Sequence, residues 1–105
     1  MHIQIVNFSL KGVSEADYRA FCEQLAPTFA AMPDLLSKVW LADAATNTYG
    51  GVYTWTNKAA MQAYMRSEIF NNVVNHPNFA NVISKDFGIL AGPTETTHGL
   101  VKVFA

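Results

Sequence analysis

Two apolar periodicities alternate along this chain, and their order limits the possible folds more than any other feature of the sequence. Runs rich in β-branched or aromatic side chains, several with alternating polarity, predict strands at residues 2–10, 37–42, 49–55 and 82–90. Apolar side chains at helical spacing predict helices over residues 15–29, 57–65 and 67–75. The chain therefore reads as strand, helix, strand, strand, helix, strand, with the second helix in two pieces.

This order predicts an α+β, ferredoxin-like βαββαβ subunit, in which both helical layers cover one face of an antiparallel sheet. At 105 residues, the chain fits a single domain, residues 1–105. The segment 94–105, with an apolar run at 100–104, is expected to be a C-terminal strand extension that can add to a partner's sheet.

The second face of such a sheet has no cover within the chain. Half of the residues are apolar, and they include seven Phe, four Tyr and two Trp, more than a domain of this size is expected to bury alone. We therefore expect a homodimer, a ligand cavity, or both, to take up the remaining apolar surface.

Several local signals mark the element ends. Ser14, followed three residues later by Asp17, predicts a helix N-cap, and Asn57 predicts another. Pro27 predicts a kink or a new turn inside the first helix. The pair Gly50-Gly51 predicts a bulge or a close approach of another backbone.

Composition excludes several classes of function. Seven Lys plus Arg against eight Asp plus Glu leave no basic surplus for nucleic acid. Cys22 is the single cysteine, which excludes an internal disulfide and a cysteine-based zinc site. No apolar run approaches the length of a membrane span, and no secretory signal pattern is present, so we expect a cytoplasmic protein without membrane partners.

The residues that can carry chemistry are aromatic, amide, amine and imidazole groups. Trp40 and Tyr53 lie on neighbouring predicted strands, and they either shape a pocket for an aromatic ligand, together with Trp55 and Tyr64, or fill the core between the two sheets of the dimer. Lys38 shares the predicted face of Trp40. A solvated lysine at the rim is the commoner arrangement, whereas an inward lysine needs an anionic partner or a ligand.

His76 and Asn7 complete the set of candidate site residues. His76 can act as a general base, because imidazole titrates near neutral pH, or it can simply cap the helix that ends before Pro77. Asn7, in the middle of the first strand, either hydrogen-bonds a ligand oxygen or is an amide at an edge or interface.

Four segments together resemble a known family. They are residues 36–40, which contain KVW, residues 50–53, which read GGVY, residues 59–64 and residues 82–87. This pattern is similar to the YdhR-type monooxygenases of the dimeric α/β-barrel superfamily, whose subunits have the ferredoxin-like order. The resemblance implies a homodimer and an oxygenase of the kind that acts on quinols or anthrones with no metal or flavin.

The same superfamily contains haem-degrading enzymes, to which this chain is also similar. Residues 64–70 resemble the corresponding helix, and Asn7 stands where those enzymes carry an asparagine. Their iron-ligating histidine would fall near Val74, two residues before His76, and two residues turn a helical side chain by about 200°. Haem ligation therefore fits this sequence poorly, and no cofactor is expected.

The function predicted from these features is a cofactor-independent monooxygenase. Its substrate would be an aromatic or conjugated small molecule held between sheet and helices, and deprotonated or oriented by His76 and Asn7. The alternative is a non-catalytic ligand-binding or stress-response protein, since the sequence has no strong acid, base or metal constellation.

Overall fold

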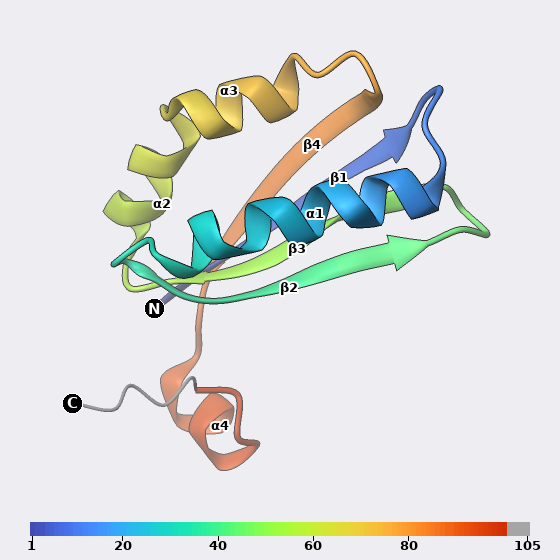
Figure 1. Ribbon diagram of the computed structural model, residues 1–105. Coiled ribbons are helices and arrows are strands. Elements are labelled where there is room, and N and C mark those ends of the chain that lie inside the picture. The colour runs from blue at the N-terminus through green and yellow to red at the C-terminus, as the bar shows by residue number, and fades with distance from the viewer. Residues whose placement is uncertain (101–105) are drawn as a thin grey trace.

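The computed structural model describes residues 1–100 and contains the predicted order of elements, followed by one additional helix (Figure 1). The elements are β1 (His2–Leu10), α1 (Glu15–Ala30), β2 (Leu35–Asp43), β3 (Thr48–Trp55), α2 (Lys58–Met65), α3 (Glu68–Val74), β4 (Phe79–Gly88) and α4 (Ala91–Thr96). The helices α2 and α3 are the two pieces of the second helical layer. The predicted α+β class and the βαββαβ order are thus confirmed.

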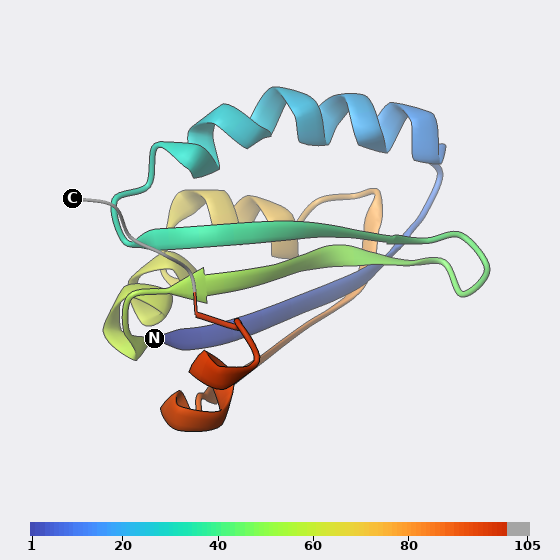
Figure 2. The same cartoon turned by 90° about the horizontal axis from the view of Figure 1, so that it is seen from below.

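The four strands form one antiparallel sheet in the order β2-β3-β1-β4. Both helical layers, α1 and the α2–α3 pair, lie on the same side of it (Figure 2). We call this side the helix face and the opposite side the open face.

Strand alternation decides which side chains meet the helices. In β1, the side chains of Gln4, Val6 and Phe8 are buried on the helix face, whereas Ile5 and Asn7 point to the open face. Tyr53 pairs with Gln4 on one side and with Lys38 on the other, so these three side chains share the helix face.

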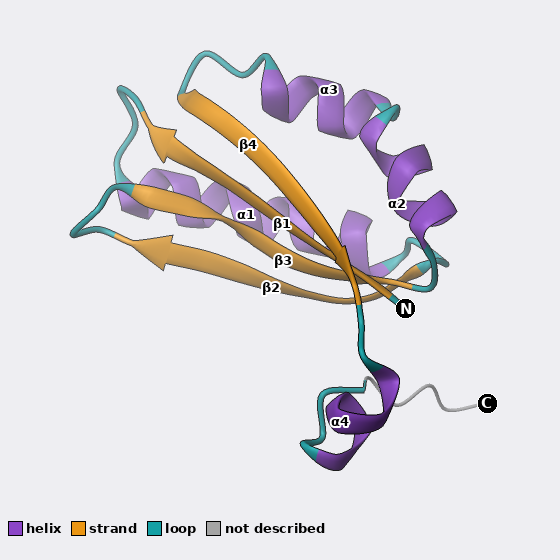
Figure 3. Cartoon of the chain, turned by 180° about the vertical axis from the view of Figure 1, so that it is seen from behind, coloured by secondary structure: helices purple, strands orange, loops and turns teal. Residues whose placement is uncertain are grey.

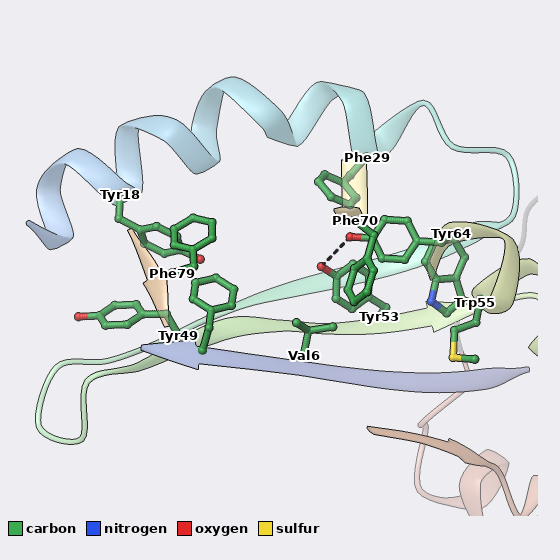
Figure 4. Close-up of a cluster of buried hydrophobic side chains, with 11 residues drawn as sticks. Val6, Tyr18, Phe29, Tyr49, Tyr53, Trp55, Tyr64, Phe70 and Phe79 are labelled. Carbon is green, nitrogen blue, oxygen red and sulfur yellow. Dashed lines mark hydrogen bonds between the residues drawn. The ribbon is translucent and has the colours of Figure 1, made fainter. Parts of the chain in front are cut away.

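The core between the helices and the helix face is mostly aromatic (Figure 4). Its buried apolar members are Val6, Phe8, Tyr18, Phe29, Tyr49, Tyr53, Trp55, Met61, Tyr64, Phe70 and Phe79. Their rings meet edge-on or stacked, for example Phe8 on Phe79 with centroids 4.4 Å apart. Much of the aromatic content therefore stabilises the subunit itself.

The predicted helix caps are confirmed. The Ser14 hydroxyl accepts a hydrogen bond from the Asp17 N–H at 3.1 Å, and the Asn57 side chain accepts one from the Ala60 N–H at 2.8 Å. The break between α2 and α3 has a similar cause, because Ser67 caps the second of them.

No new helix begins at Pro27, where a kink or a new turn was predicted. The helix α1 continues through it to Ala30. Pro27 lies on the exposed side of α1, so water can bind the carbonyl of Glu23, to which residue 27 donates no hydrogen bond.

The predicted close approach at Gly50 is confirmed. Gly50 has φ of 139°, and a Cβ there would overlap the backbone carbonyl of Val6 on the paired strand. The pairing of β1 with β4 contains a register shift between Asn7 and Ser9, and Asn81 of β4 has φ of 57°.

The predicted C-terminal strand extension is wrong for residues 94–96, which belong to α4 and lie away from the sheet (Figure 3). Pro93 is tolerated because it lies in the first turn, where no helical N–H is needed, and the Thr96 hydroxyl donates to the Gly92 carbonyl. Most of the predicted strand 100–104 lies outside the described residues. Within residues 1–100, no helix combines the length and apolarity needed to cross a bilayer.

Candidate functional site

Two neighbouring spaces lie between the helices and the sheet. The outer cavity, of about 470 Å³, opens between α1, α3 and the start of β4. Its walls are Phe21, Leu25, Ile69, Asn72, Val73, Asn75, His76, Pro77 and Phe79. The inner cavity, of about 30 Å³, lies deeper and shares Phe21, Leu25, Val73 and Phe79 with the outer one. The inner cavity therefore lies directly behind the wall of the outer one, toward the sheet.

The inner cavity reaches three of the predicted site residues, namely Lys38, Trp40 and Tyr53. Lys38 and Trp40 also line a separate space of about 390 Å³ between the C-terminal half of α1 and the edge strand β2. We call this space the edge groove. Its other walls are Ala26, Phe29, Ala30, Leu35, Leu36 and Ser37.

Lys38 does not occupy the solvated rim position that the sequence favoured. Its Nζ lies inside a cage of aromatic rings, 3.4 Å from the ring centroid of Trp40, 3.5 Å from that of Phe29 and 4.7 Å from that of Tyr53. Ring faces attract a cation. Burial removes the amine from water, and this loss of hydration lowers the pKa of Lys38 to about 7.

The position of Lys38 depends on Gly51, its diagonal neighbour on β3. A Cβ at residue 51 would lie 3.0 Å from the Lys38 Cε and 3.2 Å from a ring carbon of Tyr53. The missing side chain leaves the space through which the lysine stem crosses the helix face. The two glycines of the GGVY segment therefore have separate roles. Gly50 allows the Val6 backbone to approach closely, and Gly51 leaves room for the Lys38 side chain.

Tyr53 and Tyr64 form a buried pair whose hydroxyl oxygens are 3.4 Å apart (Figure 4). Burial is the main cause that raises the pKa of both phenols, so both stay protonated at neutral pH. Trp55 stacks on Tyr53 and donates from Nε1 to the Gln4 Oε1 at 3.0 Å.

Trp55 and Tyr64 line neither the inner nor the outer cavity. The structure places them in the core of the subunit instead of a pocket, because their faces are covered by Tyr53 and by each other. Trp40 and Tyr53 line the inner cavity and contact the core under the helices. The alternative that they fill a core between the two sheets of a dimer is wrong, because both rings lie on the helix face.

His76 lies beyond the end of α3, on the wall of the outer cavity. Its ring stacks on Phe79 with centroids 4.3 Å apart, and its Nδ1 accepts a hydrogen bond from the Asn78 N–H at 3.1 Å. A neutral imidazole that accepts at Nδ1 carries its proton on Nε2. In this arrangement Nε2 offers a hydrogen-bond donor, which fits a positioning role better than the predicted role of general base.

Asn7 is not part of this site. It lies on the open face, where it lines a hollow of about 230 Å³ with Ile5, Ile83, Lys85 and Phe87. Its Nδ2 donates to the Tyr49 carbonyl at 3.5 Å. The prediction that Asn7 and His76 act on one substrate is therefore wrong for a single subunit, because the sheet separates them.

Sequence reasoning missed most of the apolar wall of the cavities. Phe21, Cys22 and Leu25 belong to the apolar side chains at helical spacing that predict the helix over residues 15–29, a pattern typical of a buried stripe. All three line a cavity instead of being fully enclosed. Helical periodicity identifies the face that avoids water, but it does not distinguish a packed core from a cavity wall. Burial raises the pKa of the Cys22 thiol, which therefore stays protonated at neutral pH.

Metal-ligand geometry is absent from the described part of the chain. Among residues 1–100, no group of three His, Cys, Asp or Glu side chains is close enough to hold a metal ion. The polar groups at the cavities are instead one amine, one imidazole, one thiol, one indole, amides and phenols.

Comparisons with known proteins agree with this architecture. A protein of unknown function from Nitrosomonas europaea superimposes with a TM-score of 0.71 at 18% identity, over 87% of this chain and 90% of that chain. A putative antibiotic biosynthesis monooxygenase from Deinococcus radiodurans gives 0.71 at 14%, over 88% and 95%. SnoaB, a cofactor-independent oxygenase from Streptomyces nogalater, gives 0.64 at 16%, over 85% and 93%.

These likenesses concern the fold. No curated protein matches the sequence significantly. The family described as "Putative mono-oxygenase ydhR" matches residues 3–100, nearly the whole described chain, which confirms the family identified from the KVW and GGVY segments. The chain therefore belongs to the ydhR family of putative mono-oxygenases.

Proposed function

We propose that this protein is a monooxygenase that uses no bound cofactor and acts on an aromatic or conjugated small molecule. The observation that supports this best is the outer cavity, an apolar space of about 470 Å³ that shares wall residues with the smaller cavity lined by Lys38. Such a space suits a flat apolar ligand that carries one or two oxygen atoms. SnoaB, which shares the fold, is a cofactor-independent oxygenase.

The role that we propose for each residue follows from its position in the cavities. Phe21, Leu25 and Val73 hold the apolar body of the substrate, and the His76 Nε2–H donates to a substrate oxygen at the opening. Trp40 and Tyr53 form the inner wall. The neutral Lys38 amine accepts the phenolic or enolic proton, which leaves an electron-rich conjugate base that can react with dioxygen.

Oxygen uptake with an anthrone and with a quinol tests this proposal. Wild type is compared with His76→Ala, with His98→Ala as the control, because His98 is exposed and lies beyond α4. We expect His76→Ala to lower kcat/KM by about ten-fold, the effect of one lost hydrogen bond to substrate, and His98→Ala to leave it unchanged. Absence of oxygen uptake with every conjugated substrate would contradict the proposal.

A non-catalytic ligand-binding protein is the second candidate. The outer cavity favours it because its polar wall residues are limited to Asn72, Asn75 and His76, with no carboxylate among them. Binding of a conjugated ligand in calorimetry, together with no oxygen uptake, would establish this function instead.

We further propose that the subunit forms a homodimer through the open face. Three large apolar side chains on that face are strongly exposed, namely Val39 at 58%, Ile83 at 54% and Phe87 at 51%. A sheet face with this much apolar surface is typical of one that is covered in the assembled protein. A second copy is the occupant that supplies an equivalent apolar face.

A further inference from the structure

Lys38 differs from the other described lysines in its surroundings. The others have exposed side chains: Lys11, Lys58 and Lys85. Lys38 is largely enclosed, and its Nζ lies against the faces of Phe29 and Trp40. The stem that carries it lies over Gly51.

No anion of the described chain neutralises this amine. Within residues 1–100, the ion pairs are His2 with Asp86 and Arg19 with Glu15, and Lys38 makes neither a salt bridge nor a hydrogen bond. With its pKa lowered to about 7, a large fraction of the amine is neutral at pH 7. A solvated lysine has less than about one amine in a thousand in that form.

The edge groove is the route by which we expect small molecules to reach the amine. Lys38 forms part of the wall of this groove, together with Phe29 and Trp40. The groove lies beside β2, the outermost strand of the sheet. Two aromatic rings thus flank the point at which a ligand would meet Nζ, and they suit a planar conjugated group.

We propose that Lys38 is a carbonyl-capture site, at which Nζ forms an imine with small aromatic or conjugated aldehydes and ketones. The amine lone pair forms the C–N bond while the carbonyl π-bond breaks and its electrons go to oxygen. Both amine protons then leave with that oxygen as water. The step needs no oxidant or reductant.

This inference goes beyond the proposed oxygenase function and depends on no oxygen chemistry. It depends only on an accessible neutral amine at Lys38. A carbonyl compound held in this way is a conjugated oxygen-bearing molecule, which is the class of ligand that the cavities suit.

Reductive trapping tests the proposal on the full-length protein. Wild type is incubated at pH 7 with a limiting amount of benzaldehyde and sodium cyanoborohydride, which converts an imine to a stable benzylamine. Peptide mass spectrometry then counts benzyl groups at each amine, with the α-amine of Met1 counted separately. We expect Lys38 to be labelled at least about ten-fold more than Lys11, Lys58 or Lys85, with this preference shrinking by pH 10.

Two variants control the experiment. Lys38→Arg keeps a cation in the cage but has no nucleophilic amine, so it should lose the label at residue 38 and keep the other labels. Gly51→Ala adds a Cβ 3.0 Å from the Lys38 Cε, which should displace the stem and reduce the preference for Lys38. Circular dichroism verifies that both variants are folded.

Labelling of Lys38 at or below the level of the exposed lysines at pH 7 would overturn the inference. Oxygen uptake is measured on the same preparations. Uptake without selective labelling would leave the oxygenase activity standing and remove both carbonyl capture and the role of Lys38 as proton acceptor. Selective labelling without uptake would keep carbonyl capture and remove the proposed function.

Discussion

The Lys38 amine lies in an apolar environment that disfavours its charged form. The aromatic cage partly stabilises the ammonium, but removal from water costs more, and the folded protein holds the amine with a pKa of about 7. A methionine of similar length would fill the same space without this cost. A buried amine without an anionic partner therefore destabilises the subunit at neutral pH.

This cost predicts a specific pH dependence of stability. The unfolded pKa of a lysine is about 10.4, above the folded value, so the unfolded chain binds more protons between pH 7 and about 10. The free energy of unfolding therefore rises with pH across this window because of Lys38. We expect Lys38→Met to be more stable than wild type by about 3 kcal/mol at pH 7, with the difference shrinking toward pH 10.

Urea unfolding of both proteins at pH 7, 8 and 9 measures this difference. Comparison at each pH cancels the contributions of the tyrosines and other titrating groups. A difference that stays constant over the three pH values would show that the Lys38 amine is fully solvated.

A second residue-scale prediction concerns the Gln4 side chain, which is fully buried. Its Oε1 accepts from Trp55 and its Nε2 donates to the Ser84 Oγ at 2.9 Å. Trp55→Phe leaves the Gln4 oxygen without a partner and should cost about 2 kcal/mol in the free energy of unfolding.

The double variant Gln4→Leu with Trp55→Phe should lose less than the sum of the two single variants. Both partners of the same hydrogen bond are then apolar, so the second change adds little. Additive losses in urea unfolding would show that the two side chains are energetically independent.

At the scale of elements, the pairing of β1 with β3 involves two adjacent glycines that differ in how well they would tolerate a Cβ. Gly50→Ala would place a Cβ on the backbone carbonyl of Val6, which cannot move without breaking the strand pair. We expect a loss of more than about 3 kcal/mol, measured by thermal or urea unfolding.

Gly51→Ala is the matched control for this prediction. Its Cβ meets the Cε of a flexible lysine and a ring edge, which can shift by a few tenths of an ångström. It should therefore cost clearly less than Gly50→Ala. Equal losses in the two variants would mean that the close approach at Gly50 is not the limiting contact.

At the scale of the whole molecule, the sheet separates two surfaces with different roles. The helix face contains the core and the cavities, and the open face carries exposed apolar side chains together with Asn7. A dimer through the open face would bring the Asn7 side chains of two subunits into the interface.

A charge on the open face should therefore weaken the proposed dimer. We expect Phe87→Lys to raise the dimer dissociation constant by at least about ten-fold in sedimentation, since a buried lysine without a partner is costly. Val74→Lys is the control, because Val74 is also an exposed apolar residue but belongs to α3. Equal effects of both variants, or a monomeric wild type, would contradict the dimer.

The sequence by itself determined the order of elements, the helix caps at Ser14 and Asn57 and the close approach at Gly50. Each of these depends on interactions between residues near one another in the chain, or on the backbone preference of one residue type. The pairing of Lys38 with Trp40 on one strand face was also predicted, because alternation along a strand is a local property.

Only the tertiary structure decided which of these residues meet. Both faces of β1 carry apolar side chains, so alternation alone did not show that Asn7 points away from the helices. The Lys38 side chain points inward because the position above Gly51 is empty. Gly51 lies close to Lys38 only after β2 and β3 have paired. Cavity walls and packed core have the same apolar periodicity, and only the spacing of α1 and α3 over the sheet separates Phe21 and Leu25 from Trp55 and Tyr64.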